Sequence, residues 1–310
     1  MLKLDRVHKV YRVGTFGTDR LTAVSDVGFE VHPGRVVSLI GESGSGKSTI
    51  GRMVLRLASV TSGSITFAGN DVSQLRRHRH RKDYYRHVQG VFQDPFSSFN
   101  PIFKVDRVFE MLRSEYFPGT TDPEWRRRMG ESIRTVTLDP GEVLGKFPHQ
   151  LSGGQLQRLL IARALMLDLR LLVADEIISM LDASTRIDVL NLLGDLRARG
   201  LGVLFVTHDL ALGTYVSDTS VILRSGRIVE MGPTGHVFAK PQHPYTRSLL
   251  ASVPQLHRSW AEVDAELSAE PDGPCPVHTA ADTEVLPGPL VRIDDDHFVG
   301  CSGDGTGTRC

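Results

Sequence analysis

The sequence predicts an α/β fold built around a parallel sheet, and two observations support this prediction. Short apolar runs, each followed by a polar residue, occur at residues 36–40, 88–92, 171–174 and 203–207. Runs of this length are typical of buried parallel strands. The chain has 310 residues, of which 40% are hydrophobic and 23% are charged. This is enough for one large domain or two modest ones, each with a core.

Composition excludes several classes of protein. The 36 lysines and arginines balance the 36 aspartates and glutamates, so net charge creates no general attraction to nucleic acid or anionic lipid. The N-terminus lacks the apolar stretch of a signal peptide, and no run approaches the ~20 residues of a membrane helix. The three cysteines are Cys275, Cys301 and Cys310; their odd number and late position fit a reducing cytosol. Any membrane role is therefore expected to depend on a partner, and no nucleic-acid partner is expected.

The polar residues that follow the four apolar runs are of kinds that bind nucleotide phosphate. The first run leads into a glycine-rich segment containing Lys47, and the second leads into Gln93. The third ends at Asp175 and Glu176, and the fourth at His208. In open α/β sheets, ligands bind at the carboxyl ends of the strands. These side chains are therefore expected to converge on one site that binds and hydrolyses a nucleoside triphosphate.

Residues 41–48 have the phosphate-loop pattern Gly-x4-Gly-Lys-Ser. Its glycines allow backbone N–H groups to turn toward the β-phosphate, Lys47 reaches the β- and γ-phosphates, and the Ser48 hydroxyl ligates Mg2+. A helix expected over residues 48–57 directs its positive end at the same anion. The alternative, a glycine-rich surface turn, is disfavoured by the strand before the segment and the helix after it. The candidate nucleotide-binding residues of this segment are Gly41, Ser43, Gly44, Ser45, Gly46, Lys47, Ser48 and Thr49.

The other three strand ends supply candidate catalytic groups. Asp175 would hold Mg2+, often through water, and Glu176 is placed to polarise the attacking water. Gln93 can reach Mg2+ or that water, and His208 can donate to the γ-phosphate. The catalytic candidates are thus Glu176, His208 and Gln93, and the metal-ligand candidates are Ser48, Gln93 and Asp175. Each of these residues, taken alone, is also compatible with an ordinary exposed strand end.

A second anion-binding device follows a hundred residues later, at Ser152, Gly153, Gly154 and Gln155. Apolar residues then recur at a helical period, Ser152 is a suitable N-cap, and the glycines leave the helix N-terminus accessible. The chain thus carries two phosphate-binding ends but one set of strand-end catalytic groups. The economical interpretation is that the second end serves a nucleotide bound to another subunit. A head-to-tail pair of subunits would then enclose two ATP molecules.

These motifs, in this order and spacing over residues 1 to about 235, resemble the ATP-binding-cassette (ABC) ATPases. The resemblance implies a RecA-like P-loop nucleotide-binding domain with an inserted helical subdomain, an antiparallel β subdomain and a small C-terminal extension. It also implies an ATP-driven homo- or heterodimer coupled to membrane subunits. Asp182 resembles a further nucleotide-site residue, and Tyr11 resembles the aromatic residue on which the family stacks adenine. A packing role on an edge strand is the alternative for Tyr11.

One branch of the family is more similar than the rest. Residues 241–246, Pro-Gln-His-Pro-Tyr-Thr, and the loop at residues 93–101 resemble the branch that energises import of oligopeptides, dipeptides and nickel. Some relatives carry other solutes, including oligosaccharides. The resemblance implies two ATPase subunits beneath two transmembrane permeases at the cytoplasmic face of the membrane, with an extracytoplasmic solute-binding protein. It divides the chain into a nucleotide-binding domain at 1–238, with its helical subdomain at about 94–150, and an extension at 239–310.

Two departures of the chain from the family pattern bear on its chemistry. Ile177 and Ile178 follow Glu176 where the family has proline and then threonine or valine. Because proline fixes φ, its absence is expected to loosen that turn, with activity retained. The branch's extension often carries four cysteines that bind an iron–sulfur cluster. Cys275 and Cys301 match two of those positions, and two thiolates cannot fill such a site. The expected cofactors are therefore ATP and Mg2+, without a cluster.

Two other interpretations stay open at the sequence level. The first is a soluble ABC ATPase without permeases, although such chains usually carry coiled-coil insertions or tandem cassettes, and this sequence has neither. The second is a P-loop kinase, which has no use for the segment at 151–155. The basic run at 76–82 is expected to be a solvated connector, and the tail from Glu266 irregular or ordered only against the core. Five residues of the helical region are candidates for a permease contact or for internal packing: Phe103, Val108, Phe109, Met111 and Leu112.

Overall fold

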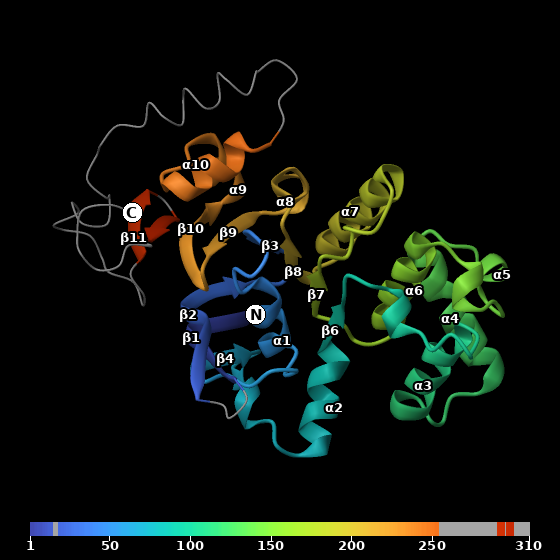
Figure 1. The fold of residues 1–310 in the computed structure, drawn as a ribbon. Coiled ribbons are helices and arrows are strands. Elements are labelled where there is room, and N and C mark those ends of the chain that lie inside the picture. Colours follow the sequence, from blue (N-terminus) through green and yellow to red (C-terminus); the bar gives the residue numbers. More distant parts are fainter. Residues whose placement is uncertain (15–17, 254–289, 295, 301–310) are drawn as a thin grey trace. The chain divides into compact units, whose positions relative to one another are not determined.

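The computed structural model of the chain describes residues 1–14, 18–253, 290–294 and 296–300. The chain divides into two compact units (Figure 1). Unit 1 contains residues 1–76 and 202–310, and unit 2 contains residues 77–201. Both contain helices and strands, as the α/β prediction requires.

The larger sheet of unit 1 combines parallel and antiparallel strands. Its central strand, β3, pairs in parallel with β8 on one side and β9 on the other. The sheet continues through antiparallel pairs from β9 to β10, β12 and β11. The strands are β3 (Val36–Ile40), β8 (Gly202–Thr207), β9 (Thr219–Arg224), β10 (Arg227–Pro233), β11 (Leu290–Asp294) and β12 (His297–Gly300). Every residue of β3 and β8 is buried, which explains why both sequences read as continuous apolar runs.

A second, antiparallel sheet of unit 1 has the strand order β2-β1-β4-β5. Its strands are β1 (Leu2–Val13), β2 (Asp19–Val31), β4 (Ser62–Phe67) and β5 (Asn70–Asp71). Leu2 and Leu4 of β1 are buried in alternation, and after a register shift Val7 and Lys9 continue the pattern, as expected for a sheet with one solvated face. The antiparallel sheet implied by the family resemblance is therefore present.

Four α-helices complete the described part of unit 1, together with a 3-10 turn, η1 (Val72–Gln74). They are α1 (Lys47–Val54), α8 (Leu210–Val216), α9 (Thr234–Ala239) and α10 (Pro244–Ala251). The helix expected over 48–57 ends three residues early. Arg56 has a φ of 56°, and the N–H groups of Leu57 and Ala58 both bond back to the Arg52 carbonyl. The chain leaves the helix through this left-handed residue, a common way for helices to end.

Unit 2 contains one parallel strand pair and six α-helices among its residues. Strands β6 (Val88–Val91) and β7 (Leu171–Asp175) pair in parallel. The helices are α2 (His78–His87), α3 (Asp106–Tyr116), α4 (Asp122–Thr135), α5 (Pro140–Val143), α6 (Gly153–Leu165) and α7 (Ala183–Ala198). Two 3-10 turns, η2 (Phe96–Ser98) and η3 (Pro148–Gln150), lie between them. The region 94–150 is thus helical, although the division of the chain into domains at 238 and 239 stays a prediction.

The five candidates for a permease contact, in α3 and just before it, differ in burial. Phe109 and Leu112 are buried within unit 2, whereas Phe103 and Met111 are exposed and Val108 is half-buried. Internal packing is therefore the role of Phe109 and Leu112. The other three candidates, Phe103, Val108 and Met111, stay available for a partner.

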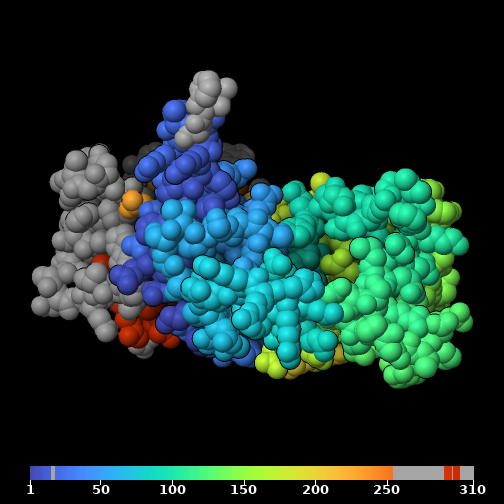
Figure 2. All heavy atoms as spheres, turned by 90° about the horizontal axis from the view of Figure 1, so that it is seen from below, coloured from blue at the N-terminus to red at the C-terminus, as the bar shows by residue number. Residues whose placement is uncertain are grey.

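The basic run forms part of a helix instead of a simple connector. Residues 78–82 belong to the first half of α2, and residues 77–81 are exposed on the face that Figure 2 shows in cyan. The run is solvated, as expected, because a helix with one buried residue, Tyr84, leaves its charged side chains in water.

Two strands of the C-terminal tail pair with each other and, through β12, with the core. Strands β11 and β12 form an antiparallel pair, and Val299 and Phe298 of β12 pair with Glu230 and Met231 of β10. Cys275, Cys301 and Cys310 lie outside the described residues. Within the described ranges, no group of three His, Cys, Asp or Glu side chains could hold a metal ion. None of the helices in those ranges has the length and hydrophobicity that crossing a bilayer requires.

Candidate nucleotide site

The segment between β3 and α1 curls into a phosphate-binding loop in unit 1. Gly44 and Gly46 have φ angles of 81° and 104°, in the region that glycine adopts without strain. A Cβ atom at Gly46 would lie 2.6 Å from the Ala23 carbonyl oxygen, and one at Gly41 would lie 2.2 Å from that of Leu223. Gly41 and Gly46 are therefore required by close backbone approach, and Gly44 by its φ alone.

Lys47 lies across the inside of this loop. Its Nζ donates to the carbonyl oxygens of Gly41 and Glu42, both at 2.7 Å, and lies 3.4 Å from Ser45 Oγ. The residue is 4% exposed, so its charge is held in the loop by oxygen atoms of the loop itself. Phosphate oxygens placed there would be further acceptors for the same ammonium group.

Helix α1 begins at Lys47, directly after Gly46. Gly46 is the N-cap of α1, and the Ile50 N–H bonds to its carbonyl oxygen at 3.0 Å. Ser48 and Thr49 lie half-buried in the first turn. The helix N-terminus thus adds its partial positive charge to that of Lys47.

His208 follows the strand next to the phosphate loop. Thr207, the last residue of β8, pairs in register with Ile40, the last residue of β3. His208 and Gly41 therefore each lie one residue beyond the end of a strand, and these two strand ends are paired, as predicted. The His208 side chain is exposed, and the turn after it is fixed by the Asp209 carboxylate, which accepts from the Leu212 N–H and caps α8.

Tyr11 lies on β1 and is half-buried. The Lys9 ammonium lies 4.7 Å from the centroid of its ring and also donates to Ser59 Oγ at 3.1 Å. One face of the ring thus has a cation contact of the usual kind. Stacking of adenine on Tyr11 stays a prediction.

In unit 2, the two parallel strands end together. Val91 of β6 pairs in register with Ala174 of β7, so Gln93 and the pair Asp175 and Glu176 follow neighbouring strand ends. Asp175 is 7% exposed, Glu176 is half-buried and Gln93 is exposed. The structure therefore places these three candidates at one edge of this strand pair.

Glu176 adopts an unusual backbone conformation. Its φ is 51°, a left-handed value that costs a non-glycine residue of the order of 1–3 kcal/mol. The turn after it is closed by Ser179, whose N–H and Oγ donate to the Glu176 carbonyl oxygen at 3.2 and 2.9 Å. Ile177 and Ile178 are 1% and 2% exposed. Hydrogen bonds and buried side chains thus hold the turn where the family has a proline.

The second anion-binding device is the N-terminus of α6. Ser152 Oγ accepts from the Gln155 N–H at 3.2 Å, and Gln155 Oε1 accepts from the Ser152 N–H at 2.9 Å. This is a reciprocal capping box, so the predicted N-cap is confirmed. A Cβ atom at Gly154 would lie 2.4 Å from Thr185 Cγ2, so α7 approaches the helix tip too closely for a side chain at that position.

Comparisons with known proteins identify this combination. The family described as "ABC transporter" matches residues 24–179, and the "Oligopeptide/dipeptide transporter, C-terminal region" matches residues 229–276. A putative peptide import ATP-binding protein of Brucella ovis is 39% identical over 92% of each chain. The chain belongs to the ABC transporter family. The oligopeptide transport ATP-binding protein OppF of Bacillus subtilis, another relative of this ABC protein, is 35% identical over 90% of each chain.

Solved structures agree with this membership. A dimeric ATP-binding cassette in a post-hydrolysis state, bound to ADP and Pi, superposes with a TM-score of 0.68 at 28% identity, covering 76% of this ABC protein and 99% of the cassette. The predicted RecA-like P-loop fold is therefore confirmed, and the chain is an ABC transporter ATPase.

Asp182 has a local structural role in this ATPase. Its carboxylate caps α7 by accepting from the Thr185 N–H at 3.0 Å, and it also accepts from the hydroxyls of Ser184 at 2.6 Å and Thr185 at 2.8 Å. The Ser184 hydroxyl, followed by the two Thr185 donors, holds the pKa of the Asp182 carboxyl well below its usual range. A contact of Asp182 with nucleotide stays a prediction.

Two contacts near the candidate residues were not predicted. Gln157 of α6 is fully buried, and its Nε2 donates to the Phe92 carbonyl oxygen, next to Gln93, at 3.3 Å. The hydroxyl of Tyr245 in α10 accepts from the N–H of Glu42 in the phosphate loop at 3.1 Å. Both join residues far apart in the chain, and no local pattern signals such a contact.

Proposed function

We propose that the chain is the ATP-hydrolysing subunit of an importer for oligopeptides or dipeptides. The family match over residues 229–276 and the peptide-import names of the relatives support this solute class. Nickel or oligosaccharide import by the same machinery is the alternative. The observation that carries the ATPase role is the loop from Gly41 to Thr49, with its buried lysine at the start of α1.

The proposed roles follow from the chemistry of each side chain. Lys47 and the loop N–H groups bind the β- and γ-phosphates, and His208 donates to the γ-phosphate. Glu176 orients and polarises the attacking water, with Gln93 beside it. Tyr11 stacks on adenine. The capping box at Ser152 leaves the N-terminal N–H groups of α6 for a nucleotide held by another subunit.

The residues present fit Mg2+ chemically. The Ser48 hydroxyl, the Asp175 carboxylate and the Gln93 amide oxygen are hard oxygen donors of the kind that Mg2+ prefers, and the ion usually keeps several waters and phosphate oxygens as its other ligands. When bound, it neutralises charge that develops on the phosphates.

The proposed assembly has three kinds of partner. A second ABC ATPase subunit, identical or related, would supply the other half of each ATP site. Two transmembrane permeases would place the pair at the cytoplasmic face of the membrane, and an extracytoplasmic binding protein would deliver the solute. The exposed Phe103 and Met111 of unit 2 are available for the permease contact.

The ATPase role is tested by Glu176→Gln. We expect ATP turnover to fall at least a hundredfold while ATP binding stays within about threefold, because the carboxylate acts on the water and not on ground-state binding. Glu142→Gln on the exposed surface of α5 is the matched control and should leave turnover unchanged. Normal turnover in Glu176→Gln would contradict the assignment.

The solute class requires a transport measurement. Cells that carry this ATPase with its permeases and binding protein should accumulate a labelled tripeptide, and Lys47→Ala should abolish that accumulation. Uptake of nickel or an oligosaccharide with no peptide uptake would replace the proposed solute but leave the ATPase role intact. Failure of the chain to co-purify with any permease would favour a soluble ABC ATPase.

A further inference from the structure

The C-terminal helix α10 contacts the phosphate loop directly. Tyr245, in its first turn, is 7% exposed, and its hydroxyl oxygen accepts from the Glu42 N–H at 3.1 Å. The Arg224 guanidinium, at the end of β9, lies 5.0 Å from the centroid of the Tyr245 ring. The ring also belongs to an apolar cluster with Ile40, the last residue before the loop, and Val237. Tyr245 is therefore fixed in position before it makes its hydrogen bond.

Tyr245 accepts its hydrogen bond from the peptide group between Gly41 and Glu42, which Lys47 also contacts. The N–H of Glu42 and the C=O of Gly41 belong to the same planar unit and point in opposite directions. Lys47 Nζ donates to that C=O at 2.7 Å, and Tyr245 receives that N–H. The peptide between residues 41 and 42 is thus held at both ends, by Lys47 on one side and Tyr245 on the other. A rotation of this peptide would break both contacts at once.

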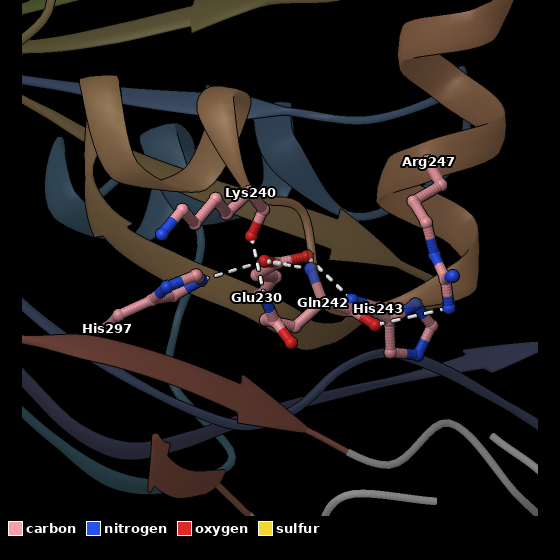
Figure 3. A network of polar contacts seen from close by, with 6 residues as sticks. All are labelled: Glu230, Lys240, Gln242, His243, Arg247 and His297. Atoms are coloured by element: carbon pink, nitrogen blue, oxygen red, sulfur yellow. Dashed lines mark hydrogen bonds and ion pairs between the residues drawn. The ribbon is translucent and has the colours of Figure 1, made fainter. Parts of the chain in front are cut away.

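A buried carboxylate fixes the start of α10 (Figure 3). Glu230 of β10 is fully buried and accepts from the N–H groups of Gln242 at 2.8 Å and His243 at 3.0 Å. It also contacts His297 Nε2 at 2.8 Å. His243 Nδ1 then accepts from the Tyr245 N–H at 3.0 Å, capping the helix. The backbone of Tyr245 is therefore linked to β10 through His243, which bonds to Tyr245 on one side and to Glu230 on the other.

We infer that Tyr245 is a positioning residue for the phosphate loop, so that the C-terminal extension is part of the nucleotide-binding machinery. By holding the 41–42 peptide, it fixes the carbonyl to which Lys47 bonds and so sets the position of the ammonium group that would meet ATP. This inference rests on the proposed role of the loop in ATP binding. It assigns the extension a function in ATP affinity that does not depend on which solute is transported.

The test compares Tyr245→Phe with Tyr116→Phe in the full chain. Tyr245→Phe removes only the hydroxyl oxygen and keeps the ring, whereas Tyr116, on α3 in unit 2, makes cation contacts through its ring and is a matched control. We expect the Kd for ATP, measured with Mg2+, to rise about three- to tenfold in Tyr245→Phe, as for loss of one hydrogen bond. The control should not change.

Amide exchange provides a readout that general destabilisation would not reproduce. In the wild-type chain without nucleotide, the Glu42 amide should exchange at least tenfold more slowly than the exposed Ser43 and Gly44 amides. In Tyr245→Phe that protection should disappear while the amides of β3 keep theirs. Fast exchange of Glu42 in the wild type, or an unchanged Kd in a folded Tyr245→Phe chain, would overturn the inference. A wild-type chain that shows Glu42 protection but no ATP binding would instead contradict the proposed function.

Discussion

Replacing Glu230 with glutamine should destabilise the chain strongly, although the two side chains have nearly the same shape. Glu230 Oε1 accepts from Gln242 N and contacts His297 Nε2, and Oε2 accepts from His243 N. The glutamine amide keeps one acceptor oxygen. In its less costly orientation, its NH2 group faces the His243 N–H, which leaves two buried donors without an acceptor. At about 1–3 kcal/mol for each of these two unsatisfied groups, the expected loss of unfolding free energy is about 2–6 kcal/mol.

Urea unfolding followed by circular dichroism measures this loss, and hydrogen exchange localises it. Exchange should accelerate first at the start of α10 and in the paired strands β10 and β12. Gln242 and His243 directly precede α10, Glu230 lies in β10, and His297 lies in β12. Glu30→Gln is the control, because Glu30 lies at the surface and its carboxylate contacts Lys3 at 3.0 Å and His32 at 3.2 Å. A surface pair of this kind contributes about 0–1 kcal/mol. The reasoning would be refuted if Glu230→Gln and Glu30→Gln lost the same small amount of stability.

Two further predictions concern the N-termini of helices α10 and α6. Burial, opposed by the nearby Glu230 charge and reinforced by those of Arg224 and Arg247, lowers the pKa of His243 to about 4 from its ordinary 6.5. The folded state therefore binds fewer protons there than the unfolded state, so stability should be complete above pH 6.5 and fall by at most about 3 kcal/mol as pH drops to about 4. His243→Asn, which keeps a capping oxygen without titrating, should flatten that slope in urea titrations at several pH values; an equally steep slope would contradict the assignment. Gly154→Ala should cost about 1–3 kcal/mol, because its Cβ would meet Thr185 Cγ2. The added Thr185→Ser change removes that methyl group and keeps the hydroxyl bonded to Asp182, so thermal unfolding of the double variant should show partial recovery; no recovery would mean that the clash is elsewhere.

The parts of the fold that could be predicted are those with local signals. The strands β3, β7 and β8 read as apolar runs because both of their faces are buried, and β6 is buried at both ends. Each of the four ends within one residue of its predicted end. The C-terminal pair β11 and β12 was not predicted as strands. Its residues are mixed in polarity, and its pairing with β10 joins segments about 70 residues apart. Such pairing depends on distant partners, which a local pattern cannot show.

The candidate site likewise contains some features that local sequence predicts and others that depend on distant residues. The phosphate loop and the capping box at Ser152 follow from backbone geometry that a few adjacent residues impose, so both could be predicted from the sequence. The contact of Tyr245 with Glu42 spans 203 positions and could not. The end of α1 was predicted three residues too late, because Arg56 adopts a left-handed conformation that propensity assigns to glycine or asparagine.

The backbone at Glu176 places two selective pressures in conflict. Its φ of 51° suits glycine or asparagine better than glutamate. Selection for higher folding stability would therefore favour replacing Glu176 and losing the carboxylate that we propose for hydrolysis. Sequences that retain glutamate here accept a weaker turn in exchange for turnover. An inactive ATPase lineage released from that requirement would be expected to accumulate small residues at position 176 before its glycine-rich loop decays.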